Sequence, residues 1–187
     1  MNIYKKWQKN ENSEGKKLFA LIIGALIFPI GIPAILVILL PQVDKTIGIG
    51  SFYIGYGNII FGVIAIIMGG FLALWTIIAQ IRLASGTPFP MLPTKKLLII
   101  GPFKYCRNPM TLGTIIAYSG VAILVGSYTA LLVVVIFSLM LLVYLKLIEE
   151  KELEMRFGQE YLEYKKNTPF LLPISIVKVQ EDHKQEI

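Results

Sequence analysis

The residues with the most chemical potential lie in the segment GPFKYCRNPMTLG, at residues 101–113, directly before a long apolar run. Asn108 is a favoured residue at the start of a helix, and Pro109 suits the first helical position, where its missing N–H costs nothing. The free N–H groups of that first turn carry the positive end of the helix dipole, and Arg107 stands beside them. Such an arrangement suits an anion, for example a carboxylate or a phosphate. The alternative is that Asn108 and Pro109 merely begin a helix while Arg107 contacts lipid phosphate.

A second charged group, the paired acids Glu149 and Glu150, lies about forty residues further along the chain. A carboxylate opposite an anion site suits a zwitterionic ligand, because Arg107 and the free N–H groups would hold its carboxylate and a glutamate would hold its ammonium. The alternative is ordinary charge pairing along a helix, since Lys146 and Glu150 are four residues apart. The elements between the two groups decide whether they meet.

The composition predicts an integral membrane protein. Of the 187 residues, 55% are hydrophobic and only 16% are charged, and the mean hydropathy of +0.67 is typical of membrane proteins. The net charge of +6 does not indicate nucleic-acid binding, because the cations flank the apolar runs. The single cysteine, Cys106, excludes an internal disulfide, and the single histidine, His183, lies in a polar tail, so we expect no metal site.

Two uncharged runs predict the first two membrane-spanning helices. Residues 18–40 and residues 52–81 are each long enough, since about 20 residues cross the hydrocarbon. Pro29 and Pro33 should kink the first of them, which membrane helices tolerate. In the second, glycines should leave flat surfaces for close helix packing. These glycines are Gly55, Gly57, Gly62, Gly69 and Gly70.

The third uncharged run, residues 108–145, predicts a helical hairpin. As one helix it would be about 57 Å long, nearly twice the hydrocarbon thickness of about 30 Å, so it must turn back. Gly126-Ser127, at its midpoint, is the turn signal. The hairpin is antiparallel and returns Glu149 to about the depth of Asn108. The two spans that result are residues 109–125 and residues 129–148.

The cations predict the orientation. Seventeen of the eighteen Lys and Arg residues lie on one side of the predicted membrane, and Lys45 lies on the other. By the positive-inside rule, both termini and the 82–107 loop should be cytoplasmic, in a prokaryotic cell membrane. The last helix should continue past the membrane to Gly158. The parts of this single all-α domain, residues 1–187, are the four spans, a cytoplasmic segment at residues 149–173 and a polar tail at residues 174–187.

Three motifs in fixed order now carry a resemblance: GPFKYCRNPMTLG, the paired glutamates after the hairpin, and FGQEYLEYKKNTPFLLP. With the upstream SGTPFPMLPTKKLLIIGPF, they cover about residues 85–173. The pattern resembles the isoprenylcysteine carboxyl methyltransferase family and is similar to the related phospholipid N-methyltransferases. This resemblance implies an integral membrane methyltransferase that uses S-adenosylmethionine, with S-adenosylhomocysteine as product. Its cofactor pocket would lie on the cytoplasmic side, between residues 101–113 and the last helix.

Carried over by position, the resemblance implies a set of site residues. Phe103 or one of the matched tyrosines would stack on the adenine. Arg107, Glu149 and Glu150 are the catalytic candidates, and a glutamate would receive the proton that an amine acceptor must lose. The acceptor would be membrane-embedded or amphipathic, either the carboxylate of an isoprenylcysteine-like compound or the amine of a phospholipid. The cofactor-binding candidates are Gly101, Tyr105, Arg107, Asn108, Pro109, Met110, Gly113, Glu149, Glu150, Tyr161 and Tyr164.

Three positions depart from the family pattern. Asn108 replaces the histidine of the carboxyl methyltransferases and is nearer the phospholipid methyltransferase form. Thr111 stands where a tyrosine is usual, and Phe170 stands where a basic residue is common. Two other functions therefore stay open: a non-catalytic membrane scaffold or accessory protein that retains the fold, and a relative of the membrane steroid reductases that binds a dinucleotide. The expected partners are membrane lipids and the lipid-like acceptor, without nucleic acid.

Overall fold

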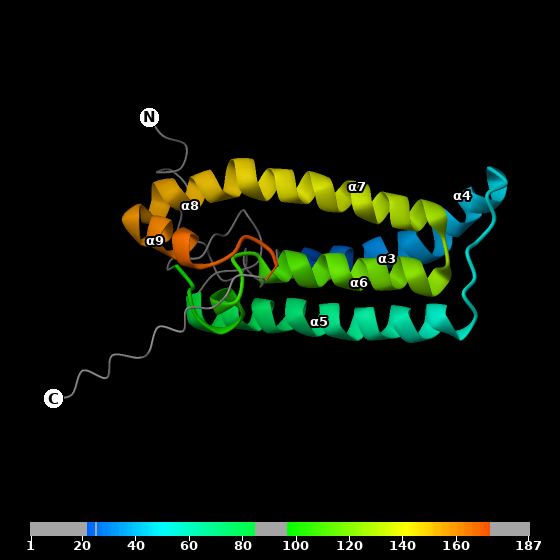
Figure 1. Ribbon diagram of the computed structural model, residues 1–187, viewed down its shortest axis with the longest axis horizontal. Coiled ribbons are helices and arrows are strands. Elements are labelled where there is room, and N and C mark those ends of the chain that lie inside the picture. The colour runs from blue at the N-terminus through cyan, green and yellow to red at the C-terminus, as the bar shows by residue number, and fades with distance from the viewer. Residues whose placement is uncertain (1–21, 25, 85–96, 173–187) are drawn as a thin grey trace.

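The computed structural model describes residues 22–24, 26–84 and 97–172, and within them it is helical without a strand (Figure 1). This confirms the predicted all-α fold. The N-terminal lysines, the first residues of the predicted first span, the segment around Lys95 and Lys96 and the polar tail lie outside the described residues. The elements, with η for π or 3₁₀ segments, are η1 (Ile27–Gly31), α3 (Ile32–Ala34), η2 (Ile35–Leu39), α4 (Leu40–Thr46), α5 (Tyr56–Ala84), η3 (Gly101–Lys104), α6 (Pro109–Val125), α7 (Tyr128–Tyr144), η4 (Leu145–Glu149), α8 (Glu150–Phe157) and α9 (Gln159–Asn167).

The first helix, Ile22–Thr46, contains Pro29 and Pro33, the two prolines that we expect to kink it. Pro29 lies inside the π-helical segment η1, and Pro33 lies between η1 and the second π-helical segment, η2. Proline removes a backbone donor and interrupts the regular hydrogen-bond ladder, so the wider turns appear beside it. The helix also passes its expected end at Leu40, because Pro41 lies in the first turn of α4, where proline is tolerated.

Helices α5 and α6 are antiparallel and lie side by side along a seam of glycines (Figure 1). A Cβ on Gly62 would lie 2.9 Å from the carbonyl oxygen of Gly120, and a Cβ on Gly113 would lie 2.6 Å from that of Gly69. The two backbones therefore meet directly, as small residues allow in membrane helix pairs. The packing role predicted for Gly62 and Gly69 is confirmed. It is wrong for Gly55 and Gly70, where a Cβ would meet no atom within 4 Å, and for Gly57, where the nearest atoms belong to the side chains of Ile54 and Phe61.

The hairpin of α6 and α7 turns at the predicted dipeptide. Gly126 has a φ of +69°, a left-handed conformation that glycine adopts without strain. The hydroxyl of Ser127 accepts a hydrogen bond from the N–H of Ala130 and caps α7. Asp44 of the first helix fixes the same corner, because it accepts from the Ser127 hydroxyl at 2.5 Å and from the Thr129 N–H at 3.0 Å. The predicted turn is confirmed, and the first helix is bonded to it.

Beyond α7 the chain stays helical as far as Phe157, through η4 and α8, past the predicted boundary of the span at residue 148. The helix ends at Gly158, which has a φ of +57° and whose N–H donates to the Glu154 carbonyl at 2.9 Å. The predicted end at Gly158 is confirmed. Helix α9 then turns back towards the start of α6 (Figure 1).

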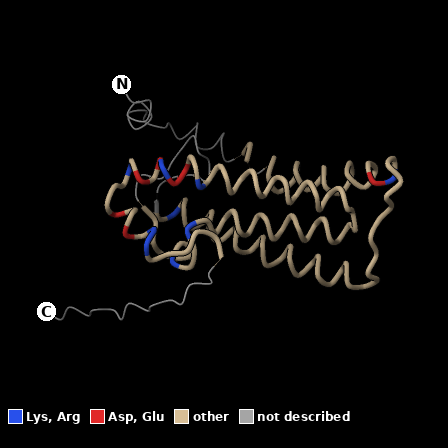
Figure 2. The backbone as a smooth tube through the Cα atoms, turned by 45° about the horizontal axis from the view of Figure 1, so that its top comes forward, with Lys and Arg blue, Asp and Glu red and all other residues tan. Residues whose placement is uncertain are grey.

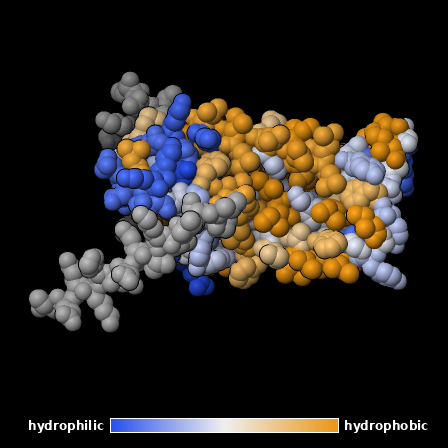
Figure 3. Space-filling view, in the orientation of Figure 1, coloured by the Kyte–Doolittle hydropathy of each residue, from blue (hydrophilic) through white to orange (hydrophobic). Residues whose placement is uncertain are grey.

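Apolar residues cover the middle of the face shown in Figure 3, and strongly hydrophilic residues gather at one end of it. Figure 2 shows most of the described charges at that same end, and only a small group beyond the opposite end of α7. Helix α6 has 17 residues and is about 26 Å long, slightly less than the hydrocarbon thickness of about 30 Å. The described part of the chain therefore contains three to four candidate membrane-spanning helices. The three that are long and apolar enough are Ile22–Thr46, Tyr56–Leu83 and Tyr128–Phe157.

Candidate functional site

The segment before α6 is held in a 3₁₀ turn at the charged end of the bundle. Gly101 opens the turn with a φ of +64°, which glycine permits, and Pro102 behind it is fully buried. The N–H of Tyr105 closes the turn on the Pro102 carbonyl at 3.2 Å. From α9, the hydroxyl of Tyr164 donates to the carbonyl of Phe103 at 2.6 Å. The turn is thus fastened to the C-terminal helix.

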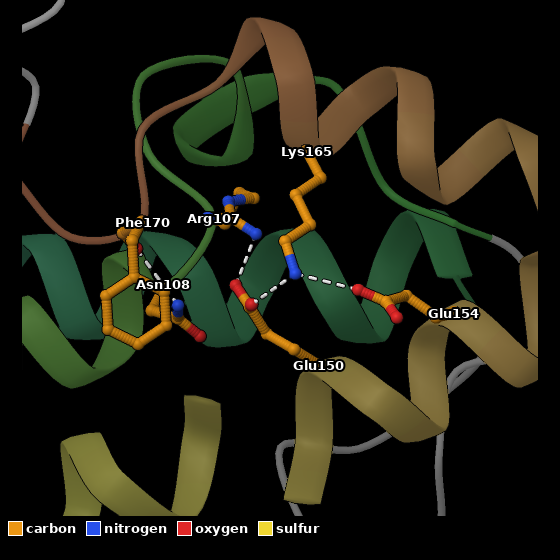
Figure 4. A network of polar contacts seen from close by, with 6 residues as sticks. All are labelled: Arg107, Asn108, Glu150, Glu154, Lys165 and Phe170. Carbon is orange, nitrogen blue, oxygen red and sulfur yellow. Dashed lines mark hydrogen bonds and ion pairs between the residues drawn. The ribbon is translucent and has the colours of Figure 1, made fainter. Parts of the chain in front are cut away.

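The residues after α9 cross the start of α6 (Figure 4). The backbone N–H of Arg107 donates to the Pro169 carbonyl at 2.9 Å, and the side-chain amide of Asn108 donates to the Phe170 carbonyl at the same distance. Asn108 occupies the N-cap position, as predicted, but its side chain makes no capping bond. The predicted helix start is therefore confirmed, and the Asn108 side chain bonds the segment after α9 instead of the first turn of α6.

An ion network joins this loop to the last two helices (Figure 4). A guanidinium nitrogen of Arg107 bonds Oε1 of Glu150, and Nζ of Lys165 lies 2.8 Å from Oε2 of Glu150 and 2.7 Å from Oε1 of Glu154. The Arg107 and Glu150 side chains are only 10% and 5% exposed, whereas Lys165 is 35% exposed. Glu150 therefore pairs with Arg107 and Lys165 rather than with Lys146, and the interpretation as simple pairing along one helix is wrong.

Arg107 is the centre of this site and is not fully satisfied. Its Nε is buried and finds no acceptor among the described residues. The Phe170 ring lies 5.5 Å from the guanidinium carbon, within cation–π range. Burial raises the pKa of the neighbouring Tyr161 and the charge of Glu150 adds to this, whereas the charge of Arg107 and a side-chain hydrogen bond with Arg107 lower it. The site thus offers one buried N–H donor that is without a partner in the described part of the chain.

The structure brings part of the predicted set together. Glu150 meets Arg107 as expected, but Glu149, half-buried at the end of η4, is not a member of the network. Tyr105 is 54% exposed, and its ring faces Trp75 with centroids 6.4 Å apart. The predicted residues that the structure gathers around the network are Arg107, Asn108, Glu150, Tyr161 and Tyr164.

The remaining candidates have positions that packing explains. Gly113 lies about one helical turn into α6, in the seam with α5, where a Cβ would lie 2.7 Å from the Ala73 N. Gly101 provides the positive φ of η3. Pro109 is fully buried at the first helical position, and Met110 is half-buried beside it. These residues shape the start of α6.

Lys165 and Glu154 belong to the network but were not predicted from the sequence. They lie on α9 and α8, two helices whose contact the hairpin of α6 and α7 does not indicate. The available signal was the order of the elements: a glycine between two short charged helices predicts that the second folds back on the first, which brings Lys165 to the acids of α8.

In the part of the chain that the structure describes, no group of three or more His, Cys, Asp or Glu residues is arranged to hold a metal ion. No curated protein matches the sequence. The phospholipid methyltransferase family model matches residues 58–160, from α5 to the first residues of α9. This match covers more than half of the chain and agrees with the superfamily that the motifs resemble. The chain therefore belongs to the phospholipid methyltransferase family.

Proposed function

We propose that this membrane methyltransferase transfers a methyl group from S-adenosylmethionine to the amine of a membrane phospholipid. The observation that carries the proposal is the buried guanidinium of Arg107, which pairs with Glu150 and keeps its Nε free at the start of α6. In the proposed enzyme, residues 1–187 form one domain whose charged end faces the cytoplasm.

The donor set at this end fits the amino-acid part of S-adenosylmethionine. The buried Nε of Arg107 needs an acceptor, because an unsatisfied buried donor costs free energy, and a ligand carboxylate would supply one. The N–H groups of Met110 and Thr111 lie in the first turn of α6, where no helical carbonyl can accept from them. They also favour a negatively charged ligand group. Glu150 offers a carboxylate to an ammonium. A dinucleotide, the ligand of the steroid reductases, has no ammonium for this carboxylate to bind.

When bound, S-adenosylmethionine would supply an electrophilic methyl group on a sulfonium. The chain's own part is mainly to orient the reactants and to exclude water. Tyr161 and Tyr164 are buried beside the network, and Phe170 covers Arg107, so these side chains keep water from the ion pair. An amine acceptor must also lose a proton. Both oxygens of Glu150 are already paired, with Arg107 and with Lys165, so we assign the proton to Glu149.

Two features favour an amine over a carboxylate acceptor. The family model is that of phospholipid methyltransferases, and Asn108 follows their form of the motif.

Calorimetry with S-adenosylhomocysteine, on protein in lipid nanodiscs, tests the cofactor. Because charge-assisted hydrogen bonds contribute about 1.5–3 kcal/mol, Arg107→Gln and Glu150→Gln should each weaken binding by roughly 10- to 150-fold. Glu152→Gln, which removes a carboxylate from the separate pair with Arg156, should not. Unchanged binding in both site variants would refute the site, and the absence of binding by the unaltered protein would refute the cofactor.

The acceptor is tested separately with labelled S-adenosylmethionine. Nanodiscs that contain phosphatidylethanolamine should yield labelled N-methylated lipid, whereas nanodiscs that contain only phosphatidylglycerol should not. Label in a carboxyl ester would overturn the amine assignment. Cofactor binding without any labelled product would favour the non-catalytic alternative.

A further inference from the structure

Lys165 occupies a position that the proposed ligand also requires. Its Nζ lies 2.8 Å from Oε2 of Glu150, while the other oxygen of that carboxylate is held by Arg107 (Figure 4). A lysine ammonium and the α-ammonium of an amino acid are both compact cations with three N–H donors. Both would bind the same open side of the Glu150 carboxylate, so one must leave before the other can bind there.

Lys165 can leave Glu150 and still keep an ionic partner. Its Nζ already lies 2.7 Å from Oε1 of Glu154, whose side chain is 33% exposed, compared with 5% for Glu150. The lysine itself is 35% exposed and has a flexible four-carbon stem. Glu154 therefore offers an alternative position at the surface, one helical turn along α8. The buried Arg107–Glu150 pair has no comparable freedom, because both of its side chains are enclosed.

We propose that Lys165 is a specificity-determining residue that competes with the ligand's ammonium for Glu150 and moves onto Glu154 when the ligand binds. This inference rests on the proposed function, because it requires an amino-acid ligand at Arg107 and Glu150. In the absence of ligand, Lys165 neutralises Glu150. Ligands that lack an ammonium do not displace it and so bind with Lys165 in place.

The test compares two probes, S-adenosylhomocysteine and its analogue without the α-amine, by calorimetry on the full chain in nanodiscs. Because a partly exposed ion pair is a weak competitor, Lys165→Gln should tighten binding of S-adenosylhomocysteine by about two- to fivefold. It should leave the affinity for the deaminated analogue nearly unchanged. Glu154→Gln removes the alternative partner and should weaken binding of S-adenosylhomocysteine by a similar factor.

Lys166→Gln is the matched control, because it removes the same charge from the next, exposed position of α9. It should leave both affinities unchanged. Equal effects of Lys165→Gln and Lys166→Gln would show a general effect of charge and overturn the inference. Equal gains for the two probes in Lys165→Gln, or tighter binding in Glu154→Gln, would also overturn it. If the unaltered protein bound neither probe, the proposed function would fail as well, which separates that failure from the others.

Discussion

The glycine seam between α5 and α6 gives the sharpest prediction, because two adjacent glycines of α5 have opposite environments. A Cβ on Gly69 would overlap the α6 backbone at Gly113 and Ala117, whereas a Cβ on Gly70 would meet no atom within 4 Å. Both residues lie inside the same helix. Gly69→Ala and Gly70→Ala therefore make the same chemical change in the same helix and differ only in the space available.

The expected effects have opposite signs. Alanine in place of glycine favours a helix by about 0.8–1 kcal/mol, and Gly70→Ala should gain part of this. In Gly69→Ala the obstacle is backbone, which cannot swing aside, so the overpacking cost of about 1–3 kcal/mol should exceed that gain. The two variants should then differ by about 1–3 kcal/mol, or roughly 2–12 °C in Tm for a chain of this size.

Thermal unfolding in detergent, followed by circular dichroism, measures this difference. Gly69→Ala should melt below the unaltered protein, and Gly70→Ala should melt at or above it. Equal Tm values for the two variants would refute the reasoning, because they would show that α5 and α6 are not in backbone contact at Gly69.

Three further predictions follow from the described contacts. Asp44→Ala removes the acceptor of the Thr129 N–H, so it should lower the free energy of unfolding by about 1.5–3 kcal/mol in denaturant titrations, with Asp44→Asn affected less. Burial raises the pKa of Tyr164, so this phenol loses its proton at a lower pH in the unfolded chain than in the folded protein. Stability should therefore fall as the pH rises above about 10, and Tyr164→Phe should make that fall shallower in Tm measured against pH. The double variant Arg107→Met, Glu150→Met should keep a free energy of unfolding within about 1 kcal/mol of that of the unaltered protein. Glu150→Met alone should cost about 3–5 kcal/mol, because it removes the acidic partner of the buried Arg107 guanidinium, whereas in Arg107→Met the carboxylate of Glu150 keeps Lys165.

The sequence predicts those features whose signals are local. Residues 109–125 match α6 at both ends, because a proline marks its first turn and Gly126 permits the left-handed conformation after its last. Gly158 ends α8 for the same reason. The first span extends past Leu40 because a proline there lies in a first turn of helix, and sequence alone does not distinguish this from a proline that ends one.

The site is predictable only in part, because its contacts depend on how separate helices are placed. The hairpin brings Glu150 to Arg107, since its two arms have similar lengths. This approach can be predicted from the sequence. Which of two adjacent glutamates faces the arginine depends on helix rotation, and the π-helical turn η4 directly before Glu150 alters that rotation. Gly113 matches a cofactor motif but lies in the packing seam. A glycine in a motif does not reveal whether the atom that needs its space belongs to a ligand or to another helix.

A buried arginine–glutamate pair is an inefficient way to join two segments, because desolvation offsets most of its attraction. The loop before α6 does not need the pair for this purpose. Tyr164 already bonds it to α9, and Asn108 and the Arg107 N–H bond it to the residues that follow. A pair that served only stability would also have little reason to keep the Nε of Arg107 buried without an acceptor among the described residues. We therefore infer that the two charges are kept out of water for recognition, at a site that the surrounding hydrogen bonds hold in shape.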